Sequence, residues 1–500
     1  MTDEKRARGD WQTPQDFALK CCQLIRDNLG FQPDHVVEPT CGIGNFIDAS
    51  REVFPDADVF GIEIDTNYVS YLYERFSSDS KVHVRQGDFL KDEITGQIAE
   101  KGSTLILGNP PWVTNSTLST LGSDNLPQKS NLKGLRGIDA LTGESNFDIC
   151  EWIILRALSS FKGDDDILAM LCKTSVARNI AIELAKSRAN VHIIMYSFDS
   201  KKVFDIQAPA CLLVCDFRSH KLLIEQTEMD SRAKSTELIF DGKSLTEKLN
   251  KEMSTLLGTC QLTWRQGVKH DCGNVMELLL DKGAYVNKLG ETVVIEDEFV
   301  FPLIKSSKSR QYVIEDAAHA VPMTQRKIGE DTNRLESVAP HFWQYLNNHA
   351  ELFDARKSSI YRNAPRFAMF GVGDYSYADY KVAVSGFYKN PVFSLAHGKK
   401  PIMFDDTCYF LAFDNEADAQ VCMLLLNSEI VQAFYQSVAF LDSKRPFSKK
   451  VLSKLDLVSA LDAVGTEGLN ETAKKIGVSF IVSNQDVKHF RSLLQQPTLF

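Results

Sequence analysis

Several features that would place the chain outside ordinary globular proteins are missing from its 500 residues. No stretch approaches the roughly 18 consecutive apolar residues that a membrane-spanning helix needs. The first ten residues are polar and charged, and the apolar segment of a secretory signal does not follow them. We therefore expect no membrane partner and a cytoplasmic location. The chain is 44% hydrophobic and long enough for two or three domains, each with its own core.

The cysteines lack the spacing of a metal site or of a redox pair. The chain has 11 cysteines, an odd number, and none forms a Cys-x-x-Cys pair. Most of them lie inside apolar runs, where cysteine behaves as a small hydrophobic residue. We therefore expect reduced and buried thiols, with no disulfide framework and no metal site.

An excess of positive charge, which is common in nucleic-acid-binding proteins, is also lacking. The net charge is −10, and residues 1–220 contribute −8 of it, from 23 basic and 31 acidic residues. Residues 356–400 differ, because they carry eight basic residues against two acidic ones, a local charge of +6. A basic surface on an acidic protein is compatible with DNA binding, although a solvated loop would have the same composition.

The first 220 residues alternate between short apolar runs and helical patterns. The β-rich runs stand at residues 35–37, 59–64, 81–84, 104–107, 167–171, 191–196 and 210–217. Helices are predicted between several of them, including 67–76 and 148–161. This alternation is typical of a doubly wound α/β sheet, which binds ligands at the carboxyl ends of its strands. A long polar segment, 116–144, interrupts it and is expected to be a functional lid or a disordered loop.

The composition changes after about residue 220. Residues 231–250 are polar and predict a connection or a small helical element, and residues 417–440 predict a helix. From Phe301 onward, aromatic and basic residues are interleaved. The predicted domains are a catalytic α/β domain over residues 1–225, a connecting region over 226–295 and an α+β domain over 296–500.

Acidic residues mark the ends of the first predicted strands. Glu38 ends the first strand, and Thr40 and a turn with Gly42 and Gly44 follow it and open a helix. Glycine permits such a tight turn and a close approach of the backbone to a ligand. Glu63 ends the second strand, where a carboxylate can accept hydrogen bonds from both ribose hydroxyls.

The third strand is followed by Asp88 and Phe89, which suit an adenine ring because the carboxylate can accept from its amine and the phenyl ring can cover it. One carboxylate at a strand end is often only a helix cap or a solvated residue, but three after successive strands favour a nucleoside site. Ile47 stands where a dinucleotide-binding turn has its third glycine, and no Gly-x-x-x-x-Gly-Lys-Ser/Thr motif occurs. The ligand is therefore predicted to be a nucleoside without a pyrophosphate.

The fourth predicted strand runs directly into Asn109, Pro110, Pro111 and Trp112. The prolines end the strand and fix the backbone, so the Asn109 side-chain oxygen and the Pro110 carbonyl can face one point, beside the flat ring of Trp112. Two acceptors that hold both N–H groups of an aromatic amine localise its lone pair. The nitrogen, held in a near-attack geometry, can then attack an electrophilic methyl group. The plain alternative is a proline-stiffened turn with a core tryptophan.

In this order the motifs resemble those of amino-methyltransferases with an Asn-Pro-Pro-aromatic motif, and most closely the gamma-class, TaqI-like DNA adenine-N6 methyltransferases of restriction–modification systems. The resemblance covers residues 11–215 well and 295–455 more loosely. It implies a Rossmann-like catalytic domain, S-adenosylmethionine as the cofactor and a C-terminal target-recognition domain. It also implies double-stranded DNA as the partner, with the target adenine flipped out of the duplex.

The resemblance assigns roles in the catalytic domain. The residues expected to bind the cofactor are Thr13, Glu38, Thr40, Gly42, Gly44, Glu63, Asp88, Phe89 and Asp148. Thr13 matches a position that contacts the methionyl carboxylate, and Asp148 belongs to a loosely aligned motif. The residues expected to be catalytic are Asn109, Pro110, Pro111, Trp112 and Phe204. Trp112 and Phe204 would hold the flipped adenine between their rings, and the alternative for Phe204 is a core position.

Runs of basic, hydroxyl and aromatic residues in the tail resemble the family's recognition domain. They are 301–307, 356–361, 370–375, 405–409 and 443–446. Such side chains suit contacts with phosphates and base edges. The expected DNA contacts are Lys305, Arg356, Lys357, Lys381, Lys444 and Arg445, and for each of them plain surface charge is the alternative.

Other substrates and functions stay open. Enzymes that methylate RNA or a protein glutamine can share the Asn-Pro-Pro-aromatic motif, but they usually lack a tail of this size. Cytosine N4 is a chemically similar target, although its enzymes more often carry serine in place of Asn109. No paired-acid-plus-lysine nuclease segment is recognisable, so a cognate restriction endonuclease would be a separate partner. An inactive DNA-binding module is disfavoured because every catalytic position is filled.

Overall fold

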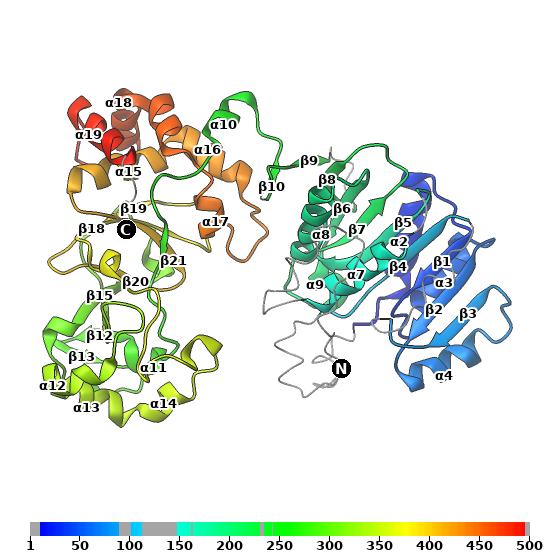
Figure 1. Ribbon diagram of the computed structural model, residues 1–500, viewed down its shortest axis with the longest axis horizontal. Helices are drawn as coiled ribbons and strands as arrows, with labels where there is room; N and C mark the ends of the chain where they lie inside the picture. Colours follow the sequence, from blue (N-terminus) through cyan, green and yellow to red (C-terminus); the bar gives the residue numbers. More distant parts are fainter. Residues whose placement is uncertain are drawn as a thin grey trace. The chain divides into compact units, whose positions relative to one another are not determined.

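The structure is a computed structural model of the chain. It describes residues 11–89, 102–112, 148–161, 164–230, 235–242 and 244–495. The polar segment predicted as a lid or disordered loop, 116–144, lies outside the described residues. The chain divides into two compact units, Met1–Lys248 and Leu249–Phe500 (Figure 1). The predicted connecting region, 226–295, contributes elements to both units.

A ten-stranded sheet forms the centre of the first unit, in the order β10-β9-β8-β6-β7-β5-β4-β1-β2-β3 (Figure 1). Its strands are β1 (His35–Glu38), β2 (Asp58–Glu63), β3 (Val82–Gln86), β4 (Thr104–Gly108), β5 (Ile167–Lys173), β6 (His192–Phe198), β7 (Ala210–Asp216), β8 (Leu223–Glu228), β9 (Thr236–Phe240) and β10 (Leu245–Glu247). Strands β1 to β5 pair in parallel, whereas β7 lies antiparallel between β5 and β6. Each strand predicted between residues 35 and 217 is present within a few residues of its expected bounds.

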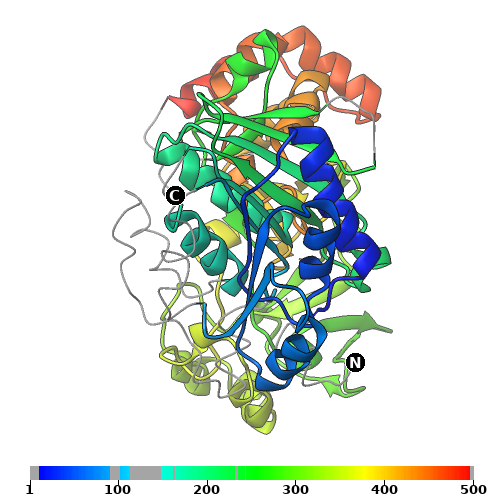
Figure 2. The ribbon, with the colours of Figure 1, turned by 90° about the vertical axis from the view of Figure 1, so that its right-hand side faces the viewer.

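Helices cover both faces of this sheet. They are α2 (Gln15–Leu29), α3 (Asn45–Val53), α4 (Thr66–Arg75), α7 (Ile149–Ser159), α8 (Thr174–Lys186) and α9 (Ser200–Phe204). Helices α3 and α4 pack against β1 to β3, and α7 and α8 pack against β5. Helix α2 packs against α3, and α7 packs against α8 (Figure 2). The arrangement confirms the expected Rossmann-like α/β fold.

The burial of the strands follows from their sequences. Strands β4 and β7 are continuous apolar runs apart from their ends, and all of their residues are buried. Such runs suit the middle of a sheet that is covered by helices on both faces. Strand β3 at the edge of the sheet contains His83, Arg85 and Gln86 and has no fully buried residue. The apolar centre of the sheet therefore lies around the strands that precede the predicted motifs.

The chain reverses the direction in which strands are added between β1 and β4. From β1 it continues to β2 and β3 on one side, and from β4 it continues to β5 on the other. In open α/β sheets, ligands bind outside the carboxyl ends of the strands at such a switch point. Glu38 is the last residue of β1, and Asn109 follows the last residue of β4. The topology thus brings the two predicted motifs to the same edge of the sheet.

The prediction of a connection or a small helical element over 231–250 is wrong in part, because β9 and β10 form strands there. They extend the sheet beyond β8, with antiparallel pairing of β8 with β9 and of β9 with β10. Only Leu238 is buried in β9. The short, mixed sequence of this edge therefore has too few buried positions to give a clear strand pattern.

The second unit contains two smaller sheets, in the orders β11-β21-β18-β19-β16 and β14-β13-β12-β17-β15-β20. Their strands are β11 (Arg265–Gln266), β12 (Leu278–Asp281), β13 (Ala284–Val286), β14 (Thr292–Val293), β15 (Val300–Ile304), β16 (Val313–Ile314), β17 (His319–Pro322), β18 (Tyr380–Ser385), β19 (Ser394–Ala396), β20 (Met403–Phe404) and β21 (Cys408–Phe413). The mixture of sheets and helices agrees with the α+β class predicted for this part of the chain.

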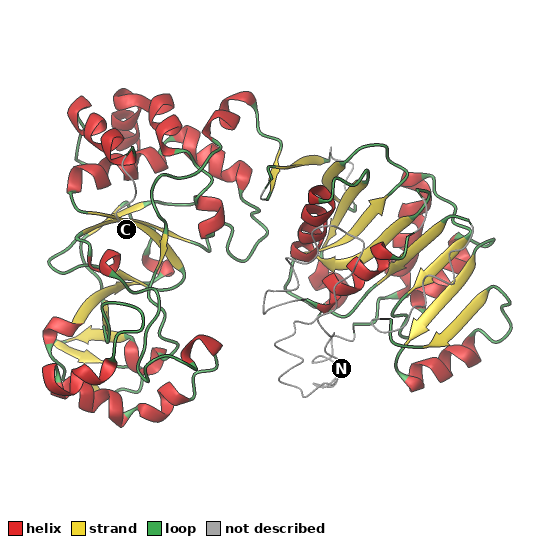
Figure 3. Ribbon diagram, viewed as in Figure 1, coloured by secondary structure: helices red, strands yellow, loops and turns green. Residues whose placement is uncertain are grey.

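Helices of the second unit gather at both of its ends (Figure 3). They are α10 (Lys251–Leu256), α11 (Gly273–Met276), α12 (Leu335–Val338), α13 (Pro340–Asn348), α14 (Ala350–Asp354), α15 (Glu416–Asn427), α16 (Glu429–Val438), α17 (Lys449–Leu452), α18 (Leu457–Ile476) and α19 (Asn484–Leu494). The helix predicted over 417–440 is present as α15 and α16. They are separated at Ser428, whose backbone is extended and whose hydroxyl donates to the Leu425 carbonyl.

Each sheet of the second unit has its own core. Helix α15 covers the five-stranded sheet, and the core there includes the fully buried Trp264, Phe434 and Tyr435. The core of the six-stranded sheet includes Phe342 and Phe367. A third, smaller cluster contains residues of β15, β16, β18, β19, β20 and β21, so it joins the two sheets.

All 11 cysteines are free thiols, and ten of them are buried. Burial raises the pKa of Cys22 and of Cys260 to about 12, so these thiols stay protonated at neutral pH. Within the described ranges no group of three or more His, Cys, Asp or Glu side chains is arranged to hold a metal ion. The helices of the described residues also include none long and apolar enough to span a membrane.

Candidate active site

The turn after β1 places a buried carboxylate at the first turn of α3. Glu38 is 3% exposed, and the backbone N–H of Ile47 donates to it. Its second oxygen, Oε2, is buried and has no hydrogen-bond partner among the described residues. Burial, together with the nearby Glu63 and Asp48 carboxylates, raises the pKa of Glu38 well above its usual range. A buried carboxylate with a free oxygen suits a cationic ligand group, which would pair with it.

Thr40 and Gly42 continue this turn in the backbone conformation that the motif predicts. The Thr40 hydroxyl oxygen is buried and has no partner among the described residues. Gly42 has φ +52°, a conformation that favours glycine. A Cβ atom at Gly42 would also lie 2.5 Å from the Gln12 side-chain oxygen, which accepts from the Ile43 N–H at 3.2 Å. The positive φ therefore favours glycine at this turn, and a Cβ atom there would need the end of the Gln12 side chain to move.

Glu63 at the end of β2 holds the same turn from the other side. Its Oε2 accepts from the Gly42 N–H at 2.7 Å, and its Oε1 accepts from the N–H groups of Ile64 and Asp65 at 2.9 Å. An ionised carboxylate has about four acceptor positions, so roughly one is left for a ligand. The predicted contact with two ribose hydroxyls therefore has room for one direct hydrogen bond. Burial raises the pKa of Glu63, and the three backbone N–H groups oppose this shift.

Asp88 and Phe89 follow β3 at the same edge of the sheet. Asp88 is half-buried, whereas Phe89 is 4% exposed, and the Arg156 guanidinium lies 6.0 Å from its ring centre. The third turn therefore places a carboxylate and a buried ring next to each other, as the adenine-binding pair requires. Ile64, which directly follows Glu63, is 51% exposed although it is large and apolar.

The N-terminal segment Trp11 to Thr13 lies across the motifs that follow β1 and β4. The Thr13 carbonyl accepts from the Asn45 amide at 2.7 Å, and the Trp11 carbonyl accepts from the Asn109 amide at 2.8 Å. Thr13 itself is 5% exposed. The first predicted motif thus contacts both the helix that follows the turn after β1 and the predicted catalytic residue Asn109.

The Asn109 side chain presents its oxygen to the site. Because its Nδ2 donates to the Trp11 carbonyl, its Oδ1 points the other way, and this oxygen is buried without a hydrogen-bond partner in the described part of the chain. Buried side-chain acceptors are usually satisfied in native proteins. An unsatisfied one at the ligand-binding edge of the sheet is therefore an available acceptor for an N–H group of a substrate.

Trp112 is fixed by the neighbouring strand. Its indole N–H donates to the Leu171 carbonyl of β5 at 3.2 Å, and the side chain is 8% exposed. Its ring meets Phe204 edge to face, with centroids 5.5 Å apart and an interplanar angle of 72°. Phe204 is 6% exposed and also packs against Phe17 and Phe198.

The expected sandwich of a base between Trp112 and Phe204 is not formed in this structure. Two rings with a third ring between them must be parallel and about 7 Å apart, twice the usual carbon contact distance. The observed rings touch each other at a steep angle instead. An entering base would have to separate them. The sequence predicts that both rings lie nearby, but it does not set the angle between them.

Asp148 has contacts within the protein on both carboxylate oxygens. One oxygen accepts from the Cys150 N–H at 3.1 Å and so caps helix α7. The other accepts from the Lys173 ammonium at 2.9 Å. In this structure Asp148 therefore contributes a helix cap and an ion pair, and not a free carboxylate for the cofactor.

Sequence reasoning missed three residues of this region. Lys173 ends β5 and contacts both Asp148 and the Trp112 carbonyl. Gln12 packs over Gly42, and Ile64 leaves a large apolar surface exposed at the end of β2. Their only sequence signal was position, since Gln12 lies inside the first motif, Ile64 directly follows Glu63, and Lys173 ends β5.

The predicted DNA contacts of the second unit are not equivalent. Arg356 donates to the carbonyls of Phe353, His270, Ala368 and Arg366, and its guanidinium lies 3.7 Å from the ring centre of Tyr361. Its donors are thus used within the fold, and burial lowers its pKa. Arg356 is therefore held within the fold, and its contact with DNA stays a prediction.

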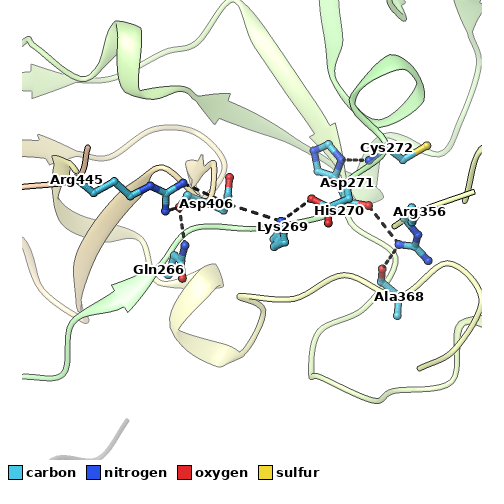
Figure 4. A network of polar contacts seen from close by, with 9 residues as sticks. All are labelled: Gln266, Lys269, His270, Asp271, Cys272, Arg356, Ala368, Asp406 and Arg445. Carbon is cyan, nitrogen blue, oxygen red and sulfur yellow. Dashed lines mark hydrogen bonds and ion pairs between the residues drawn. The ribbon is translucent and has the colours of Figure 1, made fainter. Parts of the chain in front are cut away.

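Figure 4 shows that this arginine ends a longer chain of polar contacts. Arg445 donates to the Asp406 carbonyl at 3.1 Å, and Gln266 donates to the same carbonyl at 2.6 Å. Lys269 pairs with Asp271 at 2.6 Å. Arg445 has 31% of its side chain exposed, so it keeps surface for a further contact.

His270 lies in the middle of this chain and is neutral at physiological pH, because burial lowers its pKa to about 4. Its Nδ1 accepts from the Cys272 N–H at 3.2 Å (Figure 4). Lys305, another predicted DNA contact, is paired with Glu277 at 2.7 Å. Lys357 and Lys444 are exposed and fit the prediction best.

The position of Lys381 contradicts the prediction that this residue contacts DNA. It is 1% exposed, and its ammonium donates to the carbonyls of Ala378 and Ile402 at 2.8 and 3.0 Å. It stands in β18 among apolar residues, beside the ring of Phe410. Burial lowers its pKa to about 7. Lys381 therefore has a structural position and cannot reach a phosphate.

The fold and the residues at this edge of the sheet fit an S-adenosylmethionine-dependent methyltransferase. The chain is 41% identical over 463 residues to the type II methyltransferase M.NspV of Nostoc sp., covering 90% of this chain and 96% of that protein. The chain therefore belongs to the type II methyltransferases of restriction–modification systems, and its cofactor is S-adenosylmethionine.

Other comparisons agree with this family, either over a smaller share of the chain or at the level of the fold alone. The type II methyltransferase M.CvrRI of Paramecium bursaria Chlorella virus XZ-6E is 26% identical over 174 residues, which are 35% of this chain and 38% of that protein. The type IIL restriction-modification enzyme MmeI, solved in complex with DNA, has a TM-score of 0.53 at 12% identity, over 98% of this chain and 75% of that one. No protein-family model matches the chain.

The buried Lys381 predicts a stability that depends on pH. Its pKa is lower in the folded state, about 7 against a usual value of 10.5. Between these values the unfolded chain binds more protons than the folded one, so stability rises with pH, by up to about 1.4 kcal/mol per unit. In urea unfolding from pH 7 to 9.5, the wild type should gain stability relative to Lys381→Met. The exposed control Lys357→Met should follow the wild type over this pH range. Parallel curves of unfolding free energy against pH for the wild type and Lys381→Met would contradict the lowered pKa of Lys381.

Proposed function

We propose that the chain transfers a methyl group to the N6 amine of a flipped-out adenine in double-stranded DNA, as the modification enzyme of a restriction–modification system. The observation that carries this proposal is the buried Oδ1 of Asn109, an acceptor without a partner among the described residues. An exocyclic amine is the group that such an oxygen would hold. The type IIL relative in fold was solved in complex with DNA, which supports DNA as the substrate.

The residues around the turns after β1, β2 and β3 fit the cofactor. Glu38 Oε2 and the Thr40 hydroxyl oxygen are buried and have no hydrogen-bond partner among the described residues, so the carboxylate can take the methionyl ammonium and the hydroxyl can take a further donor. Glu63 has about one acceptor position left for a ribose hydroxyl, and Asp88 and Phe89 suit the adenine. Bound there, S-adenosylmethionine supplies a methyl group on a sulfonium, which a nitrogen lone pair can attack.

Asn109 and Pro110 make the amine reactive. The Asn109 Oδ1 and the Pro110 carbonyl each accept one N–H of the adenine N6 amine, so the nitrogen becomes tetrahedral and its lone pair is no longer delocalised into the ring. The hydrogen bond from Asn109 to the Trp11 carbonyl keeps the correct end of the amide facing the amine. As the nitrogen–carbon bond forms, the carbon–sulfur bond would break and leave a neutral thioether, and the positively charged nitrogen would lose one proton to water. Holding both reactants in line supplies several kcal/mol of the rate acceleration.

Trp112 and Phe204 supply the aromatic surfaces for the base. Each ring can cover one face of a flipped adenine once the edge-to-face contact between them opens. Extruding a base from the duplex costs a few kcal/mol, which stacking on such rings offsets in part. Phe204 thus changes from a core contact to a base contact when the substrate enters.

The substrate and product are tested by transfer of labelled methyl groups from S-adenosylmethionine. With unmethylated duplex DNA, we expect label in N6-methyladenine, found by nucleoside analysis. Asn109→Ala should lower the rate at least 10²- to 10³-fold, the size of effect seen when one preorganised polar group is removed from an active site. It should still bind the cofactor. Label in N4-methylcytosine, in RNA or in a protein glutamine would overturn the proposed substrate. Only the assignment of the cofactor would then stand.

Glu38 predicts a link between cofactor binding and protons. Its pKa is raised in the free protein, and an ammonium bound beside it favours the ionised form, so binding releases a proton. Affinity for the cofactor should therefore rise with pH above the usual carboxyl range, as long as the cofactor's own amine stays protonated. Calorimetry in buffers of different ionisation enthalpy should detect the release. Glu38→Gln should bind more weakly and release no proton, and proton uptake by the wild type would contradict the assignment.

Exposed lysines of the second unit predict the salt dependence of DNA binding. Each phosphate contact contributes about 0.9 to the slope of log K against log salt concentration. Lys357→Gln and Lys444→Gln should each weaken binding equally for all DNA sequences and reduce that slope by about one. Lys475→Gln, another exposed lysine, serves as the control. Unchanged slopes for both predicted contacts would place the DNA on another surface.

A further inference from the structure

The end of β5 contacts the segment after β4 at two points. The Leu171 carbonyl accepts from the Trp112 indole, and the Lys173 ammonium donates to the Trp112 main-chain carbonyl at 3.3 Å. The same ammonium donates to Asp148, the cap of α7, at 2.9 Å. One lysine thus joins the segment 109–112 to the first turn of a helix.

The backbone of Lys173 is itself well fixed. It pairs with Ala210 of β7, and the N–H of the next residue, Thr174, donates to the Pro209 carbonyl at 3.0 Å. The Lys173 side chain is 26% exposed and that of Asp148 is 11% exposed, so the ion pair is shielded from water. Such a pair holds its geometry better than one on an open surface.

The segment 109–112 needs anchors of this kind because of its prolines. Pro110 and Pro111 have no backbone N–H, so this stretch cannot be tied down by the usual donors. The contacts that fix it are made by other groups: the Asn109 amide on the Trp11 carbonyl, the Trp112 indole on the Leu171 carbonyl, and the Lys173 ammonium on the Trp112 carbonyl. Only the last of these comes from a charged side chain.

We propose that Lys173 is a positioning residue for methyl transfer, which holds the segment 109–112 at the distance and angle that the reaction requires and couples it to Asp148. The inference rests on the proposed function, in which this segment holds the target amine. Lys173 touches neither the reacting amine nor the methyl group, and it acts through the Trp112 carbonyl.

The charge of the pair suits this position. The attacked methyl group is carried by a cation, and the amine gains positive charge during transfer. A lone ammonium nearby would oppose both charges. The Asp148 carboxylate neutralises Lys173, so the pair can fix the backbone without disfavouring the reaction.

The test compares Lys173→Met and Lys173→Arg in the full chain, with total methyl transfer to duplex DNA as the readout. A displacement of about 1 Å at a reacting group costs on the order of 10²-fold in rate. Lys173→Met should therefore lower kcat by about 10- to 100-fold, with little change in the binding of cofactor or DNA. Lys173→Arg, which keeps the charge and donors, should recover most of the loss. Asp148→Asn should lower kcat less than Lys173→Met.

A control separates positioning from general stability. Lys186→Met removes a lysine that pairs with Glu183 on the adjoining helix α8, and it should keep the wild-type kcat. Wild-type kcat in Lys173→Met, or an equal loss in Lys186→Met, would overturn the inference. So would a loss confined to cofactor affinity, which would make Lys173 part of the cofactor site. Because total transfer is measured, the comparison holds even if the methylated atom is not adenine N6, so the two proposals can fail separately.

Discussion

The hydrogen bond from the Asn109 amide to the Trp11 carbonyl fixes which end of the Asn109 side chain is left for a ligand. It fixes the amide so that Oδ1 is left buried and without a partner among the described residues. If the amide were reversed, two N–H groups would face the site and would repel the N–H groups of an amine. In the proposed function the N-terminal segment therefore acts on the chemistry, although Trp11 and Asn109 are 98 positions apart in the sequence.

The sheet topology explains why the Asn109 side chain lies close to the turn after β1. The switch point between β1 and β4 brings Glu38 and Asn109 to the same edge of the sheet, so their buried oxygens, which have no hydrogen-bond partner among the described residues, lie at the same end of the strands. Leaving such groups unsatisfied costs stability, since a buried acceptor without a hydrogen bond loses on the order of 1–3 kcal/mol. The surrounding core, with β4 buried along its whole length, compensates for this cost.

Much of this arrangement could be predicted from sequence, because it depends on local patterns. Apolar runs located the strands, and the residues that follow Glu38, Glu63 and Gly108 identified the motifs. What could not be predicted depends on packing between distant segments. The burial of Lys381 arises because β18 is apolar on both sides, and the angle between the Trp112 and Phe204 rings is set by their neighbours. The carbonyls that occupy Arg356 come from four separate residues, and no local pattern reveals them.

The most direct test of this account is the structure of the full chain bound to a cofactor analogue and to duplex DNA that contains its target. The account predicts one exocyclic nitrogen of a flipped base about 3 Å from both the Asn109 Oδ1 and the Pro110 carbonyl. It also predicts that the Trp112 and Phe204 rings have separated to admit the base. An Asn109 oxygen turned toward the protein or the cofactor, with the base held by other acceptors, would contradict the central claim.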